Sequence, residues 1–123
     1  MSVPALGGLS GGSGSVLNVL ATALDGLTTR SEVIADNIAN VDTPGFRAST
    51  VEFESSLRDA VAKGDAPTLD PEVLAVQSPV GPNGNNVDLR KELMAASQTQ
   101  FSYQLMTRAV SDQFALLSTA VGA

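Results

Sequence analysis

The side chains that could carry out chemistry in this chain are carboxylates, because the 123 residues include no Cys and no His. That composition excludes thiol nucleophiles, disulfides, the usual zinc ligands and the most frequent general base. Asp25, Glu32 and Asp36 are candidate acid–base groups, but their helical spacing predicts a solvated helix face. Glu52 and Glu54 also read as surface residues. Since no nucleophile–base pair is found, we expect that the protein is not an enzyme.

The Asn- and Gly-rich segment at 81–88 is the other candidate for a phosphate-binding or calcium-binding site. Gly81-Pro82-Asn83-Gly84 lacks the Lys-Ser/Thr pair of a phosphate-binding loop. Asn85, Asn86 and Asp88 offer oxygen ligands, but the spaced acidic ligands and the terminal Glu of a calcium loop are missing. We therefore expect no metal, no cofactor and no small-molecule substrate.

The charge and hydropathy patterns argue against nucleic acid as a partner, against a membrane span and against a signal peptide. The net charge is −6, and the seven Lys and Arg are isolated except for Arg90-Lys91, so no basic stripe is available for nucleic acid. No segment reaches the roughly 20 apolar residues that cross a bilayer, so no direct membrane span is expected. Residues 1–15 lack the basic and apolar regions of a signal peptide, which predicts another route for any export.

The N-terminal part predicts a flexible Gly/Ser leader at 1–14, followed by a single domain at 15–123. A helix is expected over 15–41, with Ser15 as its N-cap. Apolar residues recur there in alternating steps of three and four, with Ser31 in the one polar slot, as in a coiled-coil seam. This N-terminal seam consists of Leu17, Leu20, Leu24, Leu27, Ile34, Ile38 and Val41.

Residues 42–86 predict a turn, a short helix and a Pro/Gly-rich loop. Thr43-Pro44-Gly45 should end the first helix in a type II turn, with Phe46 as an apolar anchor. A short helix is expected over 50–63, with Phe53, Leu57, Ala60 and Val61 on one face and Gly64 as its C-cap. The loop at 65–86 is expected to contain at most a minor β element, around Val73–Val76.

A second long helix is expected over 87–122, with Asp88 as its N-cap. One seam of this helix reads Leu89, Leu93, Ala96, Gln100, Tyr103, Thr107, Val110, Phe114, Leu117 and Val121. Met94, Phe101, Leu105 and Leu116 lie off that seam, so the helix is apolar on two sides. The residues of this helix that we expect to act in packing are Leu89, Leu93, Met94, Phe101, Tyr103, Leu105, Val110, Phe114, Leu117 and Val121.

These elements predict a mainly α-helical protein in which two long terminal helices pair as a coiled-coil-like hairpin. The apolar area of the N-terminal seam does not offset the entropy of ordering its helix, so that helix needs a partner along its whole length. Two interpretations remain open for the extra apolar side of the second helix. Either the middle segment folds over it, or another subunit covers it on assembly.

Residues 34–47 read IADNIANVDTPGFR and contain the pattern N-x-A-N-x-x-T-P-G-F. This stretch resembles the N-terminal signature of bacterial flagellar rod and hook proteins, and Arg30 upstream fits the same family. Residues 51–57 and 84–94, together with Gln100, Phe101, Tyr103 and Gln104, are similar to the proximal type of flagellar basal-body rod protein. The resemblance covers about residues 16–121.

The resemblance implies a structural subunit of the proximal rod that polymerises through its terminal helices and takes part in motility. It also implies export by the flagellar type III apparatus into the periplasmic rod of the basal body. The implied partners are other copies of the chain, adjacent rod subunits and an adaptor between membrane ring and export gate. The amides of Asn37 and Asn40 would bond backbone or a neighbouring subunit, or serve in C-capping alone. A soluble helical adaptor or binding protein that forms a discrete oligomer is the alternative.

Overall fold

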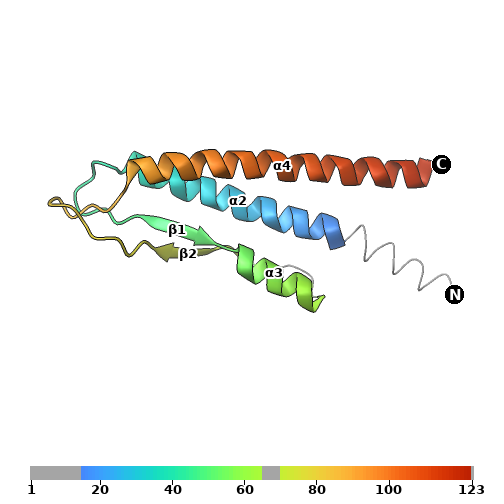
Figure 1. Cartoon of the computed structure of the whole chain (residues 1–123), viewed down its shortest axis with the longest axis horizontal. Coiled ribbons are helices and arrows are strands. Elements are labelled where there is room, and N and C mark those ends of the chain that lie inside the picture. The colour runs from blue at the N-terminus through green and yellow to red at the C-terminus, as the bar shows by residue number, and fades with distance from the viewer. Residues whose placement is uncertain (1–14, 65–69, 123) are drawn as a thin grey trace.

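The computed structural model describes residues 15–64 and 70–122, and it confirms a mainly helical fold with a small sheet. The elements follow the order α2 (Ser15–Ala39), β1 (Ser49–Glu52), α3 (Glu54–Lys63), β2 (Glu72–Ala75) and α4 (Leu89–Gly122) (Figure 1). The leader predicted at 1–14 and part of the loop at 65–69 lie outside the described residues. Helices α2 and α4 run antiparallel, side by side, as the hairpin prediction requires.

Helix α2 ends two residues earlier than predicted, because the signature that follows it forms tight turns. The Asn40 N–H donates to the Asp36 and Asn37 carbonyls at 3.1 and 3.2 Å. The Phe46 N–H then donates to the Thr43 carbonyl at 3.2 Å, and Gly45 has a φ of +77°. Proline at the second position and a positive φ at the third define a type II turn. The turn predicted from Pro44 and Gly45 is thus confirmed.

Helix α4 is 34 residues long, about 51 Å at 1.5 Å per residue. The predicted N-cap is confirmed, since the Asp88 carboxylate accepts the Lys91 N–H at 3.2 Å. About half of the α4 side chains that are buried or half-buried are small. They include Ala95, Ala96, Thr99, Ser102 and Ala109.

The helix predicted over 50–63 is wrong in its first part, where the chain forms strand β1. Residues 49–52 point alternately outward and inward, and only Val51 is fully buried. Strand β1 pairs antiparallel with β2, with Val51 opposite Val73 and Thr50 opposite Leu74. This pairing joins residues more than 20 positions apart, and helical periodicity carries no information about it. The minor β element expected around Val73–Val76 is confirmed one residue earlier.

Helix α3 begins only after Phe53 and ends at the predicted C-cap. Gly64 has a φ of 75°, and its N–H bonds to the carbonyls of Ala60 and Val61. Leu57 is half-buried, but Val61 is exposed, so the predicted apolar face of this helix is only partly covered.

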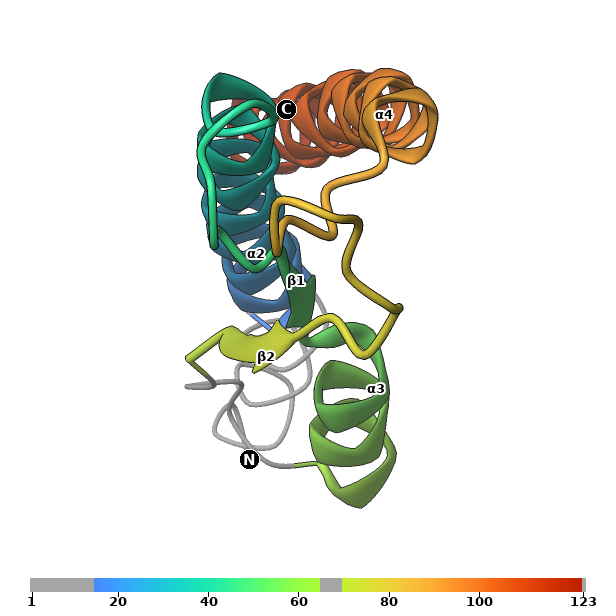
Figure 2. The ribbon, with the colours of Figure 1, turned by 90° about the vertical axis from the view of Figure 1, so that its left-hand side faces the viewer.

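Helix α2 is the central element, and α4 and the layer formed by β1, β2 and α3 lie against different sides of it (Figure 2). The core where these elements meet is made of Ala23, Leu27, Val51 and Phe53, with Val33, Leu57 and Met106 packed around it. Phe53 is the one fully buried aromatic side chain among the described residues, which matches the low aromatic content of the chain.

Candidate functional site

The signature asparagine Asn37 ties three elements together from a position that is 1% exposed. Its Nδ2 donates to the Ser49 carbonyl at 2.8 Å, and its Oδ1 accepts the Ser49 N–H at 3.1 Å. The same Nδ2 donates to the Glu92 carboxylate of α4 at 3.1 Å. An amide supplies both a donor and an acceptor, so it satisfies both backbone groups of one β1 residue as a third strand would. Asn37 therefore sets the position of β1 and α4 relative to α2.

The second signature asparagine, Asn40, organises the end of α2. Its Nδ2 donates to the Asp36 carbonyl at 2.8 Å, and its Oδ1 accepts the Thr43 hydroxyl at 3.1 Å. The Nδ2 of Asn85 donates to the carbonyls of Asn40 and Thr43, both at 2.8 Å. The Asn85 side chain, weighed above as a calcium ligand, thus fastens the loop before α4 to the signature turn.

Asn86 plays the corresponding role for the sheet. Its Oδ1 accepts the Ala48 N–H at 2.6 Å, and its Nδ2 donates to the carbonyls of Val76 and Ser78, both at 3.1 Å. Both loop asparagines are buried, and their partners lie up to 45 positions away along the chain. Sequence reasoning missed this role because the local pattern predicts only a turn, such as the bond from the Val87 N–H to Asn85 Oδ1 at 2.7 Å, and carries no information about distant partners.

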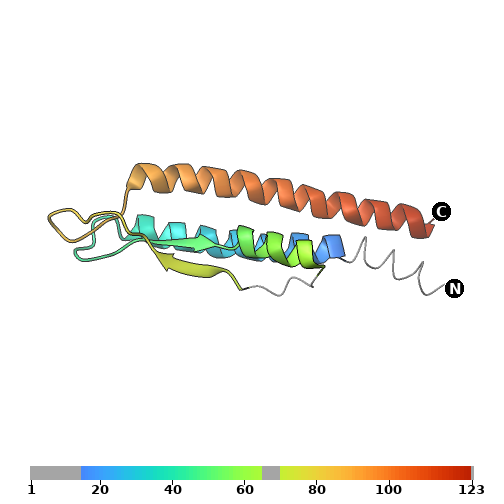
Figure 3. The ribbon, with the colours of Figure 1, turned by 60° about the horizontal axis from the view of Figure 1, so that its bottom comes forward.

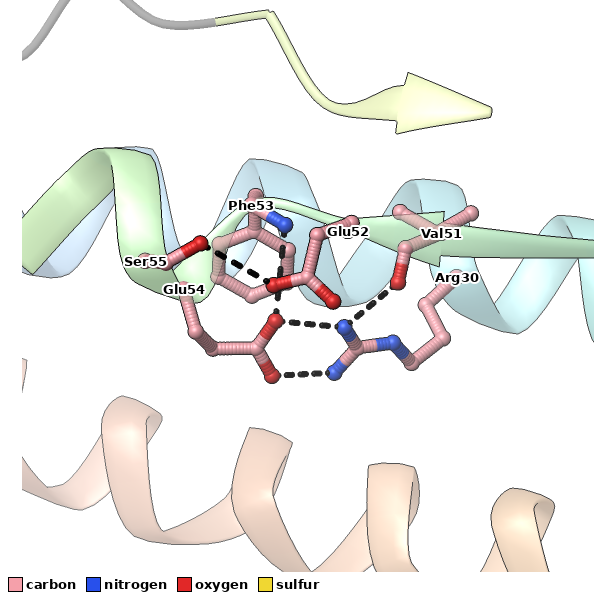
Figure 4. Close-up of polar contacts among 6 residues, drawn as sticks. All are labelled: Arg30, Val51, Glu52, Phe53, Glu54 and Ser55. Atoms are coloured by element: carbon pink, nitrogen blue, oxygen red, sulfur yellow. Dashed lines mark hydrogen bonds and ion pairs between the residues drawn. The ribbon is translucent and has the colours of Figure 1, made fainter. Parts of the chain in front are cut away.

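Arg30 forms a second connection between α2 and the layer, shown in Figure 4. Its two terminal nitrogens bind the Glu54 carboxylate at 2.6 and 2.7 Å, and Nη2 also donates to the Val51 carbonyl at 2.8 Å. The guanidinium lies 4.8 Å from the centre of the Phe53 ring. Arg30 thus binds the junction of β1 and α3 by an ion pair, a hydrogen bond to the backbone and a contact with an aromatic ring.

The ion pair shifts both partners in the direction that favours charge. The hydrogen bond from Arg30 holds the pKa of Glu54 below its usual range, against a smaller opposing effect of burial. The same bond raises the pKa of Arg30. Glu54 is about half exposed, so solvent screens the pair and its main role is positional.

The predicted N-terminal seam lies mostly on the sheltered side of α2. Leu27 and Ile34 are buried, and Leu17, Leu20, Leu24, Ile38 and Val41 are half-buried. In the signature turn, Asn37 is buried, Asn40 and Phe46 are half-buried, and Thr43, Pro44 and Gly45 are exposed.

The predicted packing residues of α4 are placed differently, because small side chains occupy its face toward α2. Only Val110 and Leu117 of that set are half-buried. The large apolar residues that remain exposed form two stripes. The Phe101 stripe consists of Met94, Phe101, Leu105 and Leu116, and the Tyr103 stripe consists of Leu89, Leu93, Tyr103, Phe114 and Val121. The middle segment packs on α2 and not along α4 (Figure 3). Both stripes therefore remain exposed in the single chain.

An open groove of about 790 Å³ runs between α4 and the layer. Ile34, Val51 and Ala95 contribute to its apolar lining, and Phe101 also lines it. The groove is lined by four carboxylates and two cations. The carboxylates belong to Glu52, Glu54, Asp88 and Glu92, and the cations are Arg30 and Lys91. The groove is therefore apolar within and acidic at its margins.

Two further observations concern residues 15–64 and 70–122 alone. No helix there is long and apolar enough to cross a membrane. Within the same ranges, no cluster of three or more acidic side chains is placed to hold a metal ion. The fold and its contacts define a class of protein: a structural helical hairpin, fastened at its turn by asparagines, whose longer helix keeps two apolar stripes uncovered.

Comparison with known sequences agrees with this class. Residues 17–47 match the family model described as flagella basal body rod protein. The chain is 36% identical over 113 residues to the flagellar basal body rod protein FlgB of Borreliella burgdorferi, covering 74% of this chain and 84% of the relative. For FlgB of Bacillus subtilis the identity is 30% over 122 residues, covering 89% and 94%. For FlgB of Escherichia coli it is 31% over 112 residues, covering 74% and 81%.

The chain belongs to the FlgB family of flagellar basal body rod proteins. Its role is structural, and its place is the rod of the flagellar basal body, in the machinery of motility.

Proposed function

We propose that the chain builds the proximal rod by polymerising through its terminal helices α2 and α4. The observation that carries this proposal is the exposure of α4 in the single chain. Phe101 and Phe114 are 63% and 59% exposed, and they lie in two stripes of nine large apolar or aromatic side chains. Uncovered apolar surface of this extent marks an interaction site. In an assembled tube, neighbouring subunits would cover it.

In this proposal α2 forms the interior of the subunit and α4 supplies the surface that contacts other subunits. The N-terminal seam on α2 forms the inside of the subunit, since Leu27 and Ile34 are buried there. The sheltered face of α4 combines small residues with Met106, Val110 and Leu117, and nine other large side chains are exposed. The asparagine-fastened turn fixes the two helices in register, so each copy presents the same surface to the next.

The partners follow from the same interpretation. Other copies of the chain, adjacent rod subunits and the adaptor between membrane ring and export gate would contact the terminal helices. Export through the flagellar type III apparatus would bring the chain to the periplasmic rod.

A substitution on α4 tests the proposal directly. Phe114→Asp places a charge in the Tyr103 stripe and should abolish swimming and remove the chain from isolated basal bodies, while its cellular amount stays normal. The matched control is Phe114→Leu, which keeps a large apolar side chain at the same position. The control should swim. Normal swimming and normal incorporation of Phe114→Asp would overturn the proposal.

A further inference from the structure

We infer that the groove between α4 and the layer of each copy receives the Tyr103 stripe of a second copy's α4. The inference rests on the proposed polymerisation and names the contact that would carry it. It makes each copy both a receptor and an insert, which is a head-to-tail contact that repeats along an assembly.

Charge is the first argument for this occupant. Helix α4 carries Arg90, Lys91 and Arg108 against Glu92 and Asp112, a net charge of +1, and Glu92 is already bonded to Asn37. Helix α2 has three acidic residues and one Arg, and the layer of β1, α3 and β2 has four acidic residues and two cations. Among the described elements, α4 is thus the one with a positive net charge, and the groove margin has a net charge of −2.

The distribution of charge around α4 selects one of its two stripes. At 100° per residue, the Tyr103 stripe lies between the α2-facing row and the row of Arg90 and Arg108. The exposed positions on that side are apolar, polar or arginine, and both acidic residues of α4 fall elsewhere. Arg90 and Arg108 lie between the two stripes, and Asp112 falls within the Phe101 stripe. The Tyr103 stripe has no carboxylate among its exposed neighbours, so it fits an apolar groove with carboxylates at its margin.

The position of the groove on α4 allows both contacts at once. Lys91, Ala95, Gln98 and Ser102 line the groove and share one side of the helix. The Tyr103 stripe occupies the other side of the α2-facing row. One helix therefore forms a wall of its own groove and remains free to enter the groove of the next copy. The wall from Asp88 to Ser102 is about 21 Å long, which is enough for four helical turns of an insert.

The experiment uses the absence of Cys from the natural sequence. Thr50→Cys places a thiol in the groove, and Ser111→Cys places one beside the Tyr103 stripe; both positions are exposed. Cells that make the double variant are treated with a short bis-maleimide reagent, and the chain in isolated basal bodies is examined on a denaturing gel. The expected result is a ladder of dimers and larger multimers. Each single variant should remain a monomer.

The control moves the second thiol by one residue. Asp112→Cys lies about 100° further around α4, away from the Tyr103 stripe, and combined with Thr50→Cys it should give at least fivefold less crosslinked product. Arg108→Glu should weaken the Thr50–Ser111 ladder, and adding Glu52→Lys should restore it. Dimers from Ser111→Cys alone, or equal crosslinking of both double variants, would overturn the inference. Chain present in basal bodies without the ladder would reject this contact and leave polymerisation standing, whereas chain absent from basal bodies would reject both.

Discussion

Gly26 of α2 leaves room for the ring of Phe53: a Cβ at that position would lie 2.6 Å from the ring carbon Cδ1 and 2.7 Å from Cγ. The ring is 5% exposed and is held between α2 and the layer, so it has little freedom to retreat. The absence of one side chain on the central helix thus allows the largest core residue to reach the guanidinium of Arg30.

Gly26→Ala should therefore destabilise the fold, although Ala normally favours a helix by about 1 kcal/mol. Overpacking of a core costs roughly 1–3 kcal/mol, so the net loss should be up to about 2 kcal/mol. Urea unfolding followed by circular dichroism measures it. Gly122→Ala is the matched control, because a Cβ there meets nothing within 4 Å. If Gly26→Ala were as stable as the parent protein, the close contact between Gly26 and the Phe53 ring would be contradicted.

Asn37→Asp should be more damaging than its small size suggests. The change replaces the Nδ2 donor with an acceptor that faces the Ser49 carbonyl and the Glu92 carboxylate. Two buried acceptors without a proton between them cost about 3 kcal/mol. Asn18→Asp, the same change at an exposed position of α2, should alter the free energy of unfolding by less than about 0.5 kcal/mol. If both changes altered the free energy of unfolding equally, Asn37 would not be the residue that connects α2 with β1 and α4.

Glu54→Gln should lower stability at neutral pH and lose its effect in acid. The folded-state pKa of Glu54 is depressed by Arg30, so the pair stabilises the fold above the ordinary glutamate pKa of about 4.3. That stabilisation disappears as the pH falls through the lower folded-state value. Because the carboxylate is half exposed, we expect a loss of less than about 1 kcal/mol at pH 7.

The pH dependence is measured as the difference in melting temperature between Glu54→Gln and the parent from pH 7 to pH 3. Glu32→Gln, an exposed glutamate of α2, serves as the control and should change little at any pH. A difference for Glu54→Gln that stayed constant to pH 3 would show that the Arg30 ion pair is not its source.

The isolated chain should be cut by proteases in the last turns of α4 before it is cut in the core. Residues from Ala115 onward are mostly exposed, whereas the core residues nearest to α4 pack at Met106. Limited digestion with chymotrypsin, which can cleave after Phe114, Leu116 and Leu117, followed by mass spectrometry gives the order of cleavage. Complete protection of the C-terminal turns in a discrete small oligomer would instead support the soluble adaptor interpretation.

Features encoded by neighbouring residues were predictable from the sequence. Pro44 and Gly45 fix their turn locally, and Asp88 and Gly64 cap helices through groups a few positions away. Strand β1 was missed because its partner lies beyond α3 and an intervening loop. The sheltered face of α4 was only partly predicted: Ala96, Val110 and Leu117 of the seam are half-buried. Ala95, Thr99 and Ser102 carry little hydrophobic signal, while most bulky residues of the pattern are exposed. The asparagine contacts depend wholly on the finished fold.

The small side chains between α2 and α4 have a mechanical consequence. Ala and Thr side chains interdigitate shallowly, so where they join the helices less dispersion energy holds them together than at Met106, which packs against the core. The buried asparagine contacts concentrate at one end of the hairpin: Asn37 connects α2 to β1 and α4, Asn85 holds the turn, and Asn86 holds the segments beside the sheet. We expect the ends of α2 and α4 that lie farthest from the turn to separate and close again more easily than the ends beside it.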